Sequence, residues 1–326
     1  MTDLKTNAFN ATDTARHLLS DYTSGNLSHA YMLIGNSGAG KRTLIYAFAK
    51  LIMCENPNGI TPCDECSSCR YFDSFGVHPN LTSVSTGNKA SIGVEDIRKM
   101  SEGVFTAPYI GTKKIYVIEN AEKMTAQAQN ALLKIIEEPP EYAVFFLLTS
   151  NRYAMLPTVI SRCRALNMSL YYYEALKDMA LSHKPQLSGN EIDILIHRSQ
   201  GLPGKLISVI DADEEYRDSI FSTVTALLNG DIEKIFEVAA SIDDREAALN
   251  FVYSVNEIMR DASIYMVCRN GDMTFNADKT EIIDNVAKKA TLRQVTRFLS
   301  ESMQTVKMLS GNVSYQLCIK NLLMKW

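Results

Sequence analysis

The sequence lacks a long hydrophobic run, an excess of positive charge and any low-complexity tract. Its longest purely apolar stretch, Ala143 to Leu148, is far shorter than the roughly 20 residues that cross a bilayer, so we expect no membrane span. Residues 1–7 show no basic region followed by an apolar stretch, which argues against a secretory signal. The net charge of −4 argues against a free-standing basic nucleic-acid binder, although it leaves room for a local basic surface.

What is present is an ordinary globular composition. The chain has 326 residues, of which 46% are hydrophobic and 21% charged, and this length predicts two or three domains rather than one core. Seven cysteines are present. An odd number without an export signal indicates reduced thiols and therefore a cytoplasmic protein.

A glycine-rich segment gives the first functional signal. Residues 35–42 read G-N-S-G-A-G-K-R, which is the G-x-x-x-x-G-K spacing of a phosphate-binding loop. The candidate nucleotide-binding residues are Gly35, Gly38, Gly40, Lys41 and Thr43. The residue after the lysine is normally Ser or Thr, because its hydroxyl ligates the Mg²⁺ of the nucleotide. Here it is Arg42, and Thr43 comes one residue too late, about 100° further around a helix.

The surrounding pattern alternates between strands and helices. We predict strands over 30–34, 81–84, 114–118 and 144–148, and helices over 41–53, 94–104 and 126–138. This alternation predicts an α/β fold with a parallel sheet covered on both faces. After about residue 168 the strand signals end, and helices are predicted over 171–182 and 189–199 and through the C-terminal part. We therefore divide the chain into a P-loop domain (1–167), a small helical lid domain (168–210) and a helical C-terminal domain (211–326).

A cysteine cluster interrupts the first domain. Cys54, Cys63, Cys66 and Cys69 have the spacing C-x8-C-x2-C-x2-C, and four thiolates in two overlapping C-x2-C pairs suit tetrahedral Zn²⁺. The segment is rich in Pro, Gly, Asn and Ser and needs such a cross-link. Structural zinc is favoured over an iron–sulfur cluster, a redox pair or unrelated free thiols.

Several motifs together resemble the AAA+ subunits of bacterial clamp loaders, the assemblies that place the sliding clamp of DNA polymerase III on DNA. Residues 115–124 are similar to the strand followed by D-E-A-D or D-E-A-E in that family, residues 130–140 to its N-A-L-L-K-x-L-E-E-P-P run, and residues 161–163 to its S-R-C motif. The four-cysteine module fits as well. The resemblance covers roughly residues 28–163 by specific motifs, and the helical remainder by layout only. It implies that residues 211–326 form an oligomerisation collar.

The departures from this family concern ATP hydrolysis. Glu119 stands where active members carry the metal-holding Asp, and Asn120 where they carry the catalytic Glu. An amide cannot take a proton from water at neutral pH, and Arg42 offers no oxygen to a metal. We therefore expect a member of the holoenzyme without intrinsic ATPase activity, in which functional ATP binding is doubtful. The alternative is an active, gamma/tau-like ATPase. A zinc-dependent nucleic-acid-binding module unrelated to replication is a third reading.

The resemblance also implies a role in trans. In this family the arginine of S-R-C, here Arg162, projects into the ATP site of the next subunit, where an arginine finger stabilises charge on the γ-phosphate. Ser161 and Cys163 would position it, although an exposed arginine after a helix is the commoner explanation of such a residue. Residues 149–151 resemble the sensor 1 position, and Lys205 stands where a sensor 2 arginine is usual. The implied partners are other clamp-loader subunits (gamma/tau and delta), the sliding clamp indirectly, and primed DNA.

Overall fold

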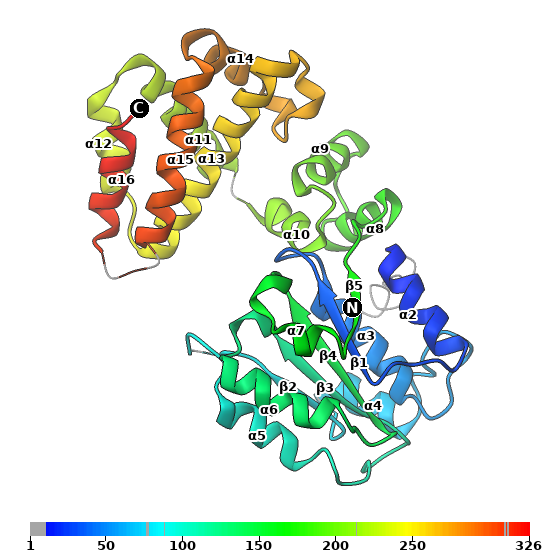
Figure 1. Ribbon diagram of the computed structural model, residues 1–326. Helices are drawn as coiled ribbons and strands as arrows, with labels where there is room; N and C mark the ends of the chain where they lie inside the picture. Colours follow the sequence, from blue (N-terminus) through cyan, green and yellow to red (C-terminus); the bar gives the residue numbers. More distant parts are fainter. Residues whose placement is uncertain (1–10, 76–77, 88, 213, 310, 312) are drawn as a thin grey trace. The chain divides into compact units, whose positions relative to one another are not determined.

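The computed structural model describes residues 11–75, 78–87, 89–212, 214–309, 311 and 313–326 (Figure 1). The N-terminal residues on which the secretory-signal expectation depends lie outside this set. The chain forms two compact units, Met1–Leu187 with Gly201–Ile207 and Ser188–Gln200 with Ser208–Trp326. The division into three domains drawn from the sequence stays a prediction.

The first unit contains a five-stranded sheet in the order β2-β3-β4-β1-β5. Every strand pair is parallel, which confirms the predicted α/β class. The strands are β1 (Ala30–Ile34), β2 (Leu81–Val84), β3 (Lys114–Glu119), β4 (Ala143–Thr149) and β5 (Arg164–Asn167). The four predicted strands are present, and β3 and β4 extend slightly beyond the predicted ends. The edge strand β5 was not predicted.

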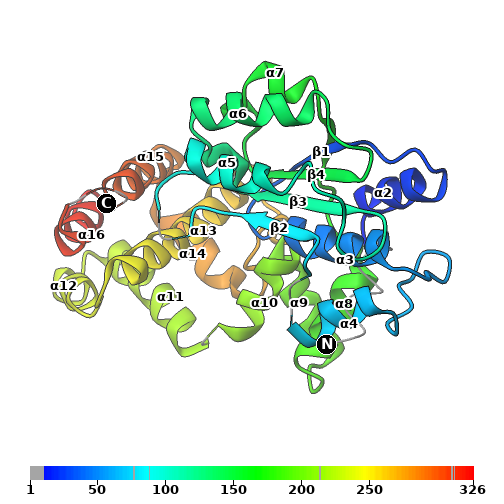
Figure 2. The ribbon, with the colours of Figure 1, turned by 90° about the horizontal axis from the view of Figure 1, so that it is seen from below.

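Alternate residues of each strand face opposite layers of helices. In β1, Tyr31 and Leu33 belong to one hydrophobic cluster and Ala30 and Met32 to the other, as the two-residue period of a strand requires. Figure 2 shows the two helical layers on opposite sides of the sheet. One layer holds α2 (Asp13–Thr23), α3 (Lys41–Met53) and α4 (Ser67–Phe75); the other holds α5 (Val94–Glu102), α6 (Ala126–Ile136) and α7 (Pro157–Ile160).

The register of the sheet places the segments that follow β1, β3 and β4 together at the carboxyl end of the sheet. Ile34 at the end of β1 pairs with Thr149 at the end of β4, and Glu119 at the end of β3 pairs with Leu148. Because all strands are parallel, their carboxyl ends meet there, which is where open α/β sheets bind ligands. The first unit is completed by η1 (Ala121–Lys123), η2 (Arg152–Ala154), α8 (Tyr173–His183) and the start of α10 (Pro203–Asp211).

In its described residues, the second unit has helices as its only regular elements. Its helices are α9 (Gly189–Ser199), the remainder of α10, α11 (Glu214–Asn229), α12 (Ile232–Ala240), α13 (Arg245–Cys268), α14 (Thr280–Lys289), α15 (Leu292–Leu309) and α16 (Tyr315–Leu323), with short 3-10 turns η3 (Gly271–Met273) and η4 (Ala277–Lys279). The long helix α13 supplies Phe251, Val255 and Met259 to a core that α11 to α16 share. In the described part of the chain, each helix is too short or too polar to cross a membrane.

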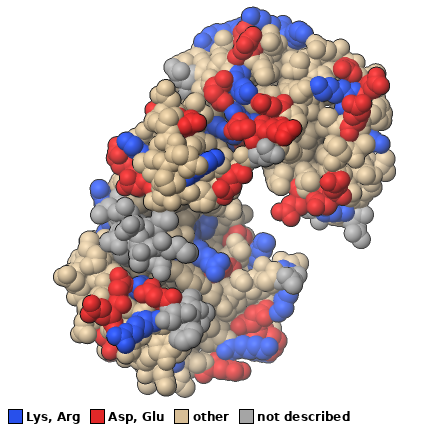
Figure 3. Space-filling model, turned by 180° about the vertical axis from the view of Figure 1, so that it is seen from behind, with Lys and Arg blue, Asp and Glu red and all other residues tan. Residues whose placement is uncertain are grey.

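Charged side chains of both signs are spread over each unit. On the face drawn in Figure 3, Lys and Arg lie interspersed with Asp and Glu over both units. This distribution agrees with the small negative net charge of −4. The view therefore gives no sign of a broad basic surface on that face.

Candidate functional site

The phosphate-binding loop adopts the conformation that its sequence predicts. Gly38 and Gly40 have φ angles of 77° and 79°, in the left-handed region that glycine enters without steric cost. Gly40 is the N-cap of α3, so the loop amides and the helix N-terminus converge as an anion site requires. Gly35 anchors the start of the loop by donating its N–H to the carbonyl of Thr149 at 3.0 Å.

Close packing also requires glycine at two of these positions. A Cβ at Gly35 would lie 2.7 Å from the Cβ of Met168, and one at Gly40 would lie 2.5 Å from the hydroxyl of Tyr171. The N–H of Gly204 donates to the carbonyl of Gly38 at 2.9 Å. The loop is therefore held from outside by the segments that precede α8 and open α10.

Lys41 turns back toward the loop. Its Nζ donates to the carbonyl oxygens of Gly35 and Asn36, at 2.5 and 2.9 Å. Burial lowers the pKa of Lys41, and the nearby Glu122 opposes that shift. The predicted phosphate-binding cation is thus located in the loop, with two of its three N–H donors bonded to loop carbonyls.

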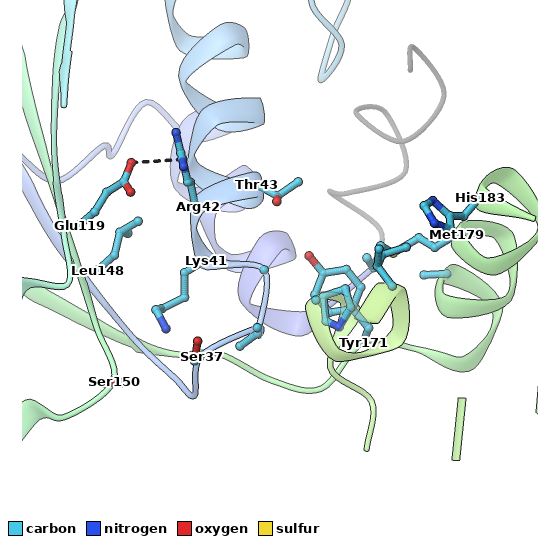
Figure 4. Close-up of a pocket in the computed structure, with 18 of the residues that line it drawn as sticks. Ser37, Lys41, Arg42, Thr43, Glu119, Leu148, Ser150, Tyr171, Met179 and His183 are labelled. Atoms are coloured by element: carbon cyan, nitrogen blue, oxygen red, sulfur yellow. Dashed lines mark ion pairs between the residues drawn. The ribbon is translucent and has the colours of Figure 1, made fainter. Parts of the chain in front are cut away.

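The two residues that depart from the metal-binding pattern contact each other. The Nε of Arg42 lies 3.2 Å from Oε1 of Glu119. The hydroxyls of Tyr46 and Ser83 donate to the same carboxylate oxygen, at 3.2 and 3.1 Å. In Figure 4 the pair lies on one side of the first turn of α3 and Thr43 on the other. Thr43 therefore cannot replace the hydroxyl missing at position 42.

The residues after β3 are also unsuited to activating water. Asn120 has a φ of 52°, a left-handed conformation that asparagine tolerates better than most residues. Glu122 accepts hydrogen bonds from the hydroxyl and backbone N–H of Ser150, at 2.6 and 3.3 Å. Although burial raises its pKa, the hydrogen bonds from Ser150 and Thr149 hold the pKa of Glu122 below its usual value. Glu122 is thus a bonded carboxylate and a weak base.

A cavity of about 740 Å³ joins the loop to α8 and to the start of α10, a size typical of small-molecule and cofactor sites. One wall carries the loop, Glu119, Asn120, Glu122 and Ser150, and most side chains of the other wall are apolar. This second wall was not predicted. Its apolar members are Ala11, Tyr171, Ala175, Met179, Pro203 and Ile207, and α8 adds the polar residues Asp178, Ser182 and His183. Burial raises the pKa of Tyr171 to about 12, so its phenol stays neutral.

The two sensor-like segments have different placements. Ser150 lines the cavity, while Asn151 caps η2 by accepting the N–H of Tyr153. Near Lys205, the residues that line the cavity are Pro203, Gly204 and Ile207, and Lys205 is not among them. The sensor roles of these residues stay predictions.

The four clustered cysteines converge on one point. The Sγ atoms of Cys54, Cys63, Cys66 and Cys69 all lie within 4.8 Å of one another. Tetrahedral zinc with Zn–S bonds of about 2.3 Å needs sulfur–sulfur distances near 3.8 Å, and the Cys54–Cys63 and Cys54–Cys66 distances are 3.5 and 4.0 Å. The thiols are not disulfide-bonded. The residues present therefore fit a metal ion, and zinc suits the donor set.

Backbone groups orient these sulfurs. The N–H groups of Cys63, Cys66 and Cys69 donate to the Sγ atoms of Cys54, Cys63 and Cys66, at 3.3 to 3.4 Å. Such bonds favour thiolates, the form that binds metal.

Two buried side chains tie the module to the sheet domain, and neither was predicted. Lys50, at the end of α3, contacts the carboxylates of Asp64 and Asp73 at 2.5 and 2.9 Å. His78 accepts the N–H of Asn80 at Nδ1, so its Nε2 donates to Ser68. Burial lowers the pKa of His78 to about 4, so the ring is neutral near pH 7. Neither residue belongs to the C-x8-C-x2-C-x2-C pattern, so the cysteine spacing did not reveal them.

Arg162 follows the short helix α7 at the surface. Its Nη2 lies 2.9 Å from Oε1 of Glu137, and its side chain is 37% exposed. Its Nη1 donates to the carbonyl of Thr158 at 3.1 Å and lies 3.4 Å from the hydroxyl of Ser161. Glu137 belongs to the E-E-P-P run, so the S-R-C and E-E-P-P segments meet through this ion pair.

Ser161 and Cys163, the two neighbours of Arg162 in the chain, make contacts within the sheet domain. Ser161 donates its hydroxyl to the carbonyl of Thr158 at 3.0 Å. Cys163 packs against the core of the sheet domain, and burial raises the pKa of its thiol to about 12. Cys163 is therefore a protonated packing residue. The role of Arg162 toward another subunit stays a prediction.

Comparison with known proteins points to one family. A family model described as "DNA polymerase III, delta subunit" matches residues 10–171. The chain is 28% identical to the DNA polymerase III subunit gamma/tau of Mycoplasma genitalium, over 78% of this chain and 46% of that protein. It is 30% identical to subunit delta' of Escherichia coli, over 60% of this chain and 58% of that one, and 35% identical to subunit delta' of Yersinia pestis, over 51% and 47%. The chain thus spans about half the length of these relatives.

Proposed function

Because this chain belongs to the clamp-loader family of DNA polymerase III, we propose that it is a delta-prime-like subunit that does not hydrolyse ATP. The observation that carries the proposal is the ion pair between Arg42 and Glu119. An active P-loop ATPase needs a hydroxyl and a carboxylate at these positions to hold Mg²⁺. Here the carboxylate of Glu119 pairs with the guanidinium of Arg42, and Asn120 stands at the position of the catalytic base, where its amide cannot accept a proton.

The chain's chemical contribution is Arg162. Its guanidinium lies at the surface of the sheet domain, on a short segment held by Glu137 and Thr158. In an assembly of clamp-loader subunits it enters the ATP site of a neighbour and stabilises charge on the γ-phosphate. The planar, permanently charged guanidinium suits that task better than a lysine ammonium.

The remaining features complete the proposal. The four cysteines hold a structural zinc ion, the lid segment 168–210 adjoins the nucleotide cavity, and the helical part 211–326 assembles with gamma/tau and delta subunits as a collar. The protein acts in the cytoplasm, assists loading of the sliding clamp on primed DNA, and contacts DNA only within the complex.

The experiment is a reconstitution of the clamp loader with wild-type and Arg162→Ala chains. An arginine finger contributes a factor on the order of 10³ to 10⁵ in rate, so ATP turnover at the affected site should collapse. Arg98→Ala is the control, because Arg98 is an exposed arginine of the same unit that pairs with Glu95. Unchanged turnover with Arg162→Ala in an assembled complex would refute the role in trans.

The second candidate is an active gamma/tau-like ATPase. It is favoured by the intact loop and Lys41, and by the relatives named gamma/tau that match 68% to 78% of this chain. Zinc-dependent DNA binding by the chain alone would instead support the module unrelated to replication. Two measurements on the purified chain separate these readings: ATP turnover that Lys41→Ala abolishes, and DNA binding that chelation abolishes.

A further inference from the structure

We propose that the cavity beside the phosphate-binding loop binds a nucleoside polyphosphate without a divalent metal, because Arg42 has replaced the metal ion as the partner of Glu119. The site would then bind nucleotide independently of magnesium, instead of having lost nucleotide binding altogether. This inference goes beyond the proposed function, since it holds whether or not Arg162 acts on a neighbour.

The metal does not fit the residues present. Mg²⁺ requires close octahedral oxygen ligands and usually takes one or two from protein side chains. The side chain at position 42 has only nitrogen donors. Among the described residues, three carboxylates line the cavity, those of Glu119, Glu122 and Asp178. Glu119 accepts three interactions at one oxygen, from Arg42, Tyr46 and Ser83, and its side chain is only 16% exposed. Glu122 accepts two hydrogen bonds from Ser150, and Asp178 lies on α8 in the opposite wall. A metal ion at Glu119 would have to displace a positive charge that is already paired there.

The anion end of the site is intact. Gly38 and Gly40 keep the left-handed angles that aim the loop amides at a common point. Lys41 lines the cavity and its third N–H remains available for a phosphate oxygen. Backbone amides and one lysine bind phosphate by hydrogen bonding and charge, and neither requires a metal.

The other end suits a base. Tyr171, Met179, Pro203 and Ile207 give the cavity an apolar wall, and Figure 4 shows Tyr171 and Met179 on the side of the loop that faces away from the Arg42–Glu119 pair. A ligand with an anionic end and a flat apolar end satisfies both walls. The cavity volume of about 740 Å³ leaves room for such a molecule.

The test is calorimetric titration of the full-length chain with ATP and with ADP, in EDTA and in excess Mg²⁺. For the wild type we expect dissociation constants that agree within about twofold between the two buffers. Lys41→Ala should weaken binding by about ten- to a hundredfold, the value of hydrogen bonds to a charged group. Arg42→Thr should bind ATP at least about tenfold more tightly with Mg²⁺ than with EDTA, because it supplies a hydroxyl and releases Glu119.

Controls separate the possible failures. Arg98→Thr removes another glutamate-paired arginine outside the cavity and should bind nucleotide like the wild type. Arg162→Ala should also bind nucleotide like the wild type, which would show that binding at this site is independent of the role of Arg162 in trans. Thermal unfolding of each variant shows that it is folded. Wild-type binding that requires Mg²⁺, or no binding of either nucleotide by folded wild-type chain, would overturn the inference. Pyrophosphate that binds as tightly as ATP would overturn the assignment of the apolar wall to the base.

Discussion

Arg42 and Glu119 stand at the two positions from which an active P-loop ATPase holds its metal, and in this chain they bind each other, with Nε 3.2 Å from Oε1. The side chain of Arg42 is 69% exposed, so the pair contributes less than about 1 kcal/mol to folding stability. Its importance is therefore chemical: in the proposal made above, the guanidinium takes the place of a metal ion beside Glu119.

We expect that restoring the hydroxyl alone does not restore hydrolysis. The Arg42→Thr chain should show no ATP turnover, because Asn120 still supplies no base, and general base catalysis contributes about 10² to 10⁴ in rate. Only Arg42→Thr combined with Glu119→Asp and Asn120→Glu replaces all three altered groups. The measurement is phosphate release by the reconstituted complex. Turnover at the chain's own site in the single variant would show that Asn120 is not the limiting change.

The ion pair between Arg162 and Glu137 should have a small effect on the trans reaction. Both side chains are more than one-third exposed, at 37% and 45%, and such pairs contribute at most about 1 kcal/mol. Glu137→Gln should therefore lower the ATP turnover of the assembled complex by no more than about fivefold, against the far larger loss with Arg162→Ala. An equal loss in both variants would mean that Glu137 itself reaches the neighbouring site.

The cysteine cluster should contain one zinc ion per chain, measurable by elemental analysis. Cys66→Ser should lose the metal and lower the free energy of unfolding by several kcal/mol, since metal binding contributes directly to folding. Cys268→Ser is the matched control, because Cys268 is an exposed cysteine outside the cluster. Full zinc content in Cys66→Ser, or none in the wild type, would contradict the assignment.

His78 should make stability depend on pH. Burial lowers its pKa to about 4 in the folded chain, against about 6.5 in the unfolded chain. Between these values the unfolded chain binds more protons, so stability falls as pH decreases from about 6.5 to 4, by up to about 3 kcal/mol. Chemical denaturation of wild type and His78→Gln at several pH values measures this contribution. The variant should show a shallower dependence, and an unchanged slope would assign the effect to other groups.

The sheet domain could be predicted well because its signals are local. The strand–loop–helix over residues 30–53 has apolar strand residues, glycines at the turn and a helical period, each of which acts over a few residues. The edge strand β5 (Arg164–Asn167) was missed because it is short and three of its four residues are exposed, so it carries no hydrophobic pattern. The helix α4 was missed because it begins inside the cysteine segment, whose composition suggested irregular structure.

The sequence by itself determined the family, the loop conformation, the four-cysteine cluster and the three departures at Arg42, Glu119 and Asn120, since each is a matter of residue type at a fixed spacing. Only the tertiary structure decided which of these residues meet. The parallel register brings Glu119 beside the first turn of α3, so that the guanidinium of Arg42 forms an ion pair with this carboxylate. It also decided that Lys50, His78 and the apolar wall around Tyr171 belong to the sites, because contacts between residues distant in the chain depend on packing and leave no local signal.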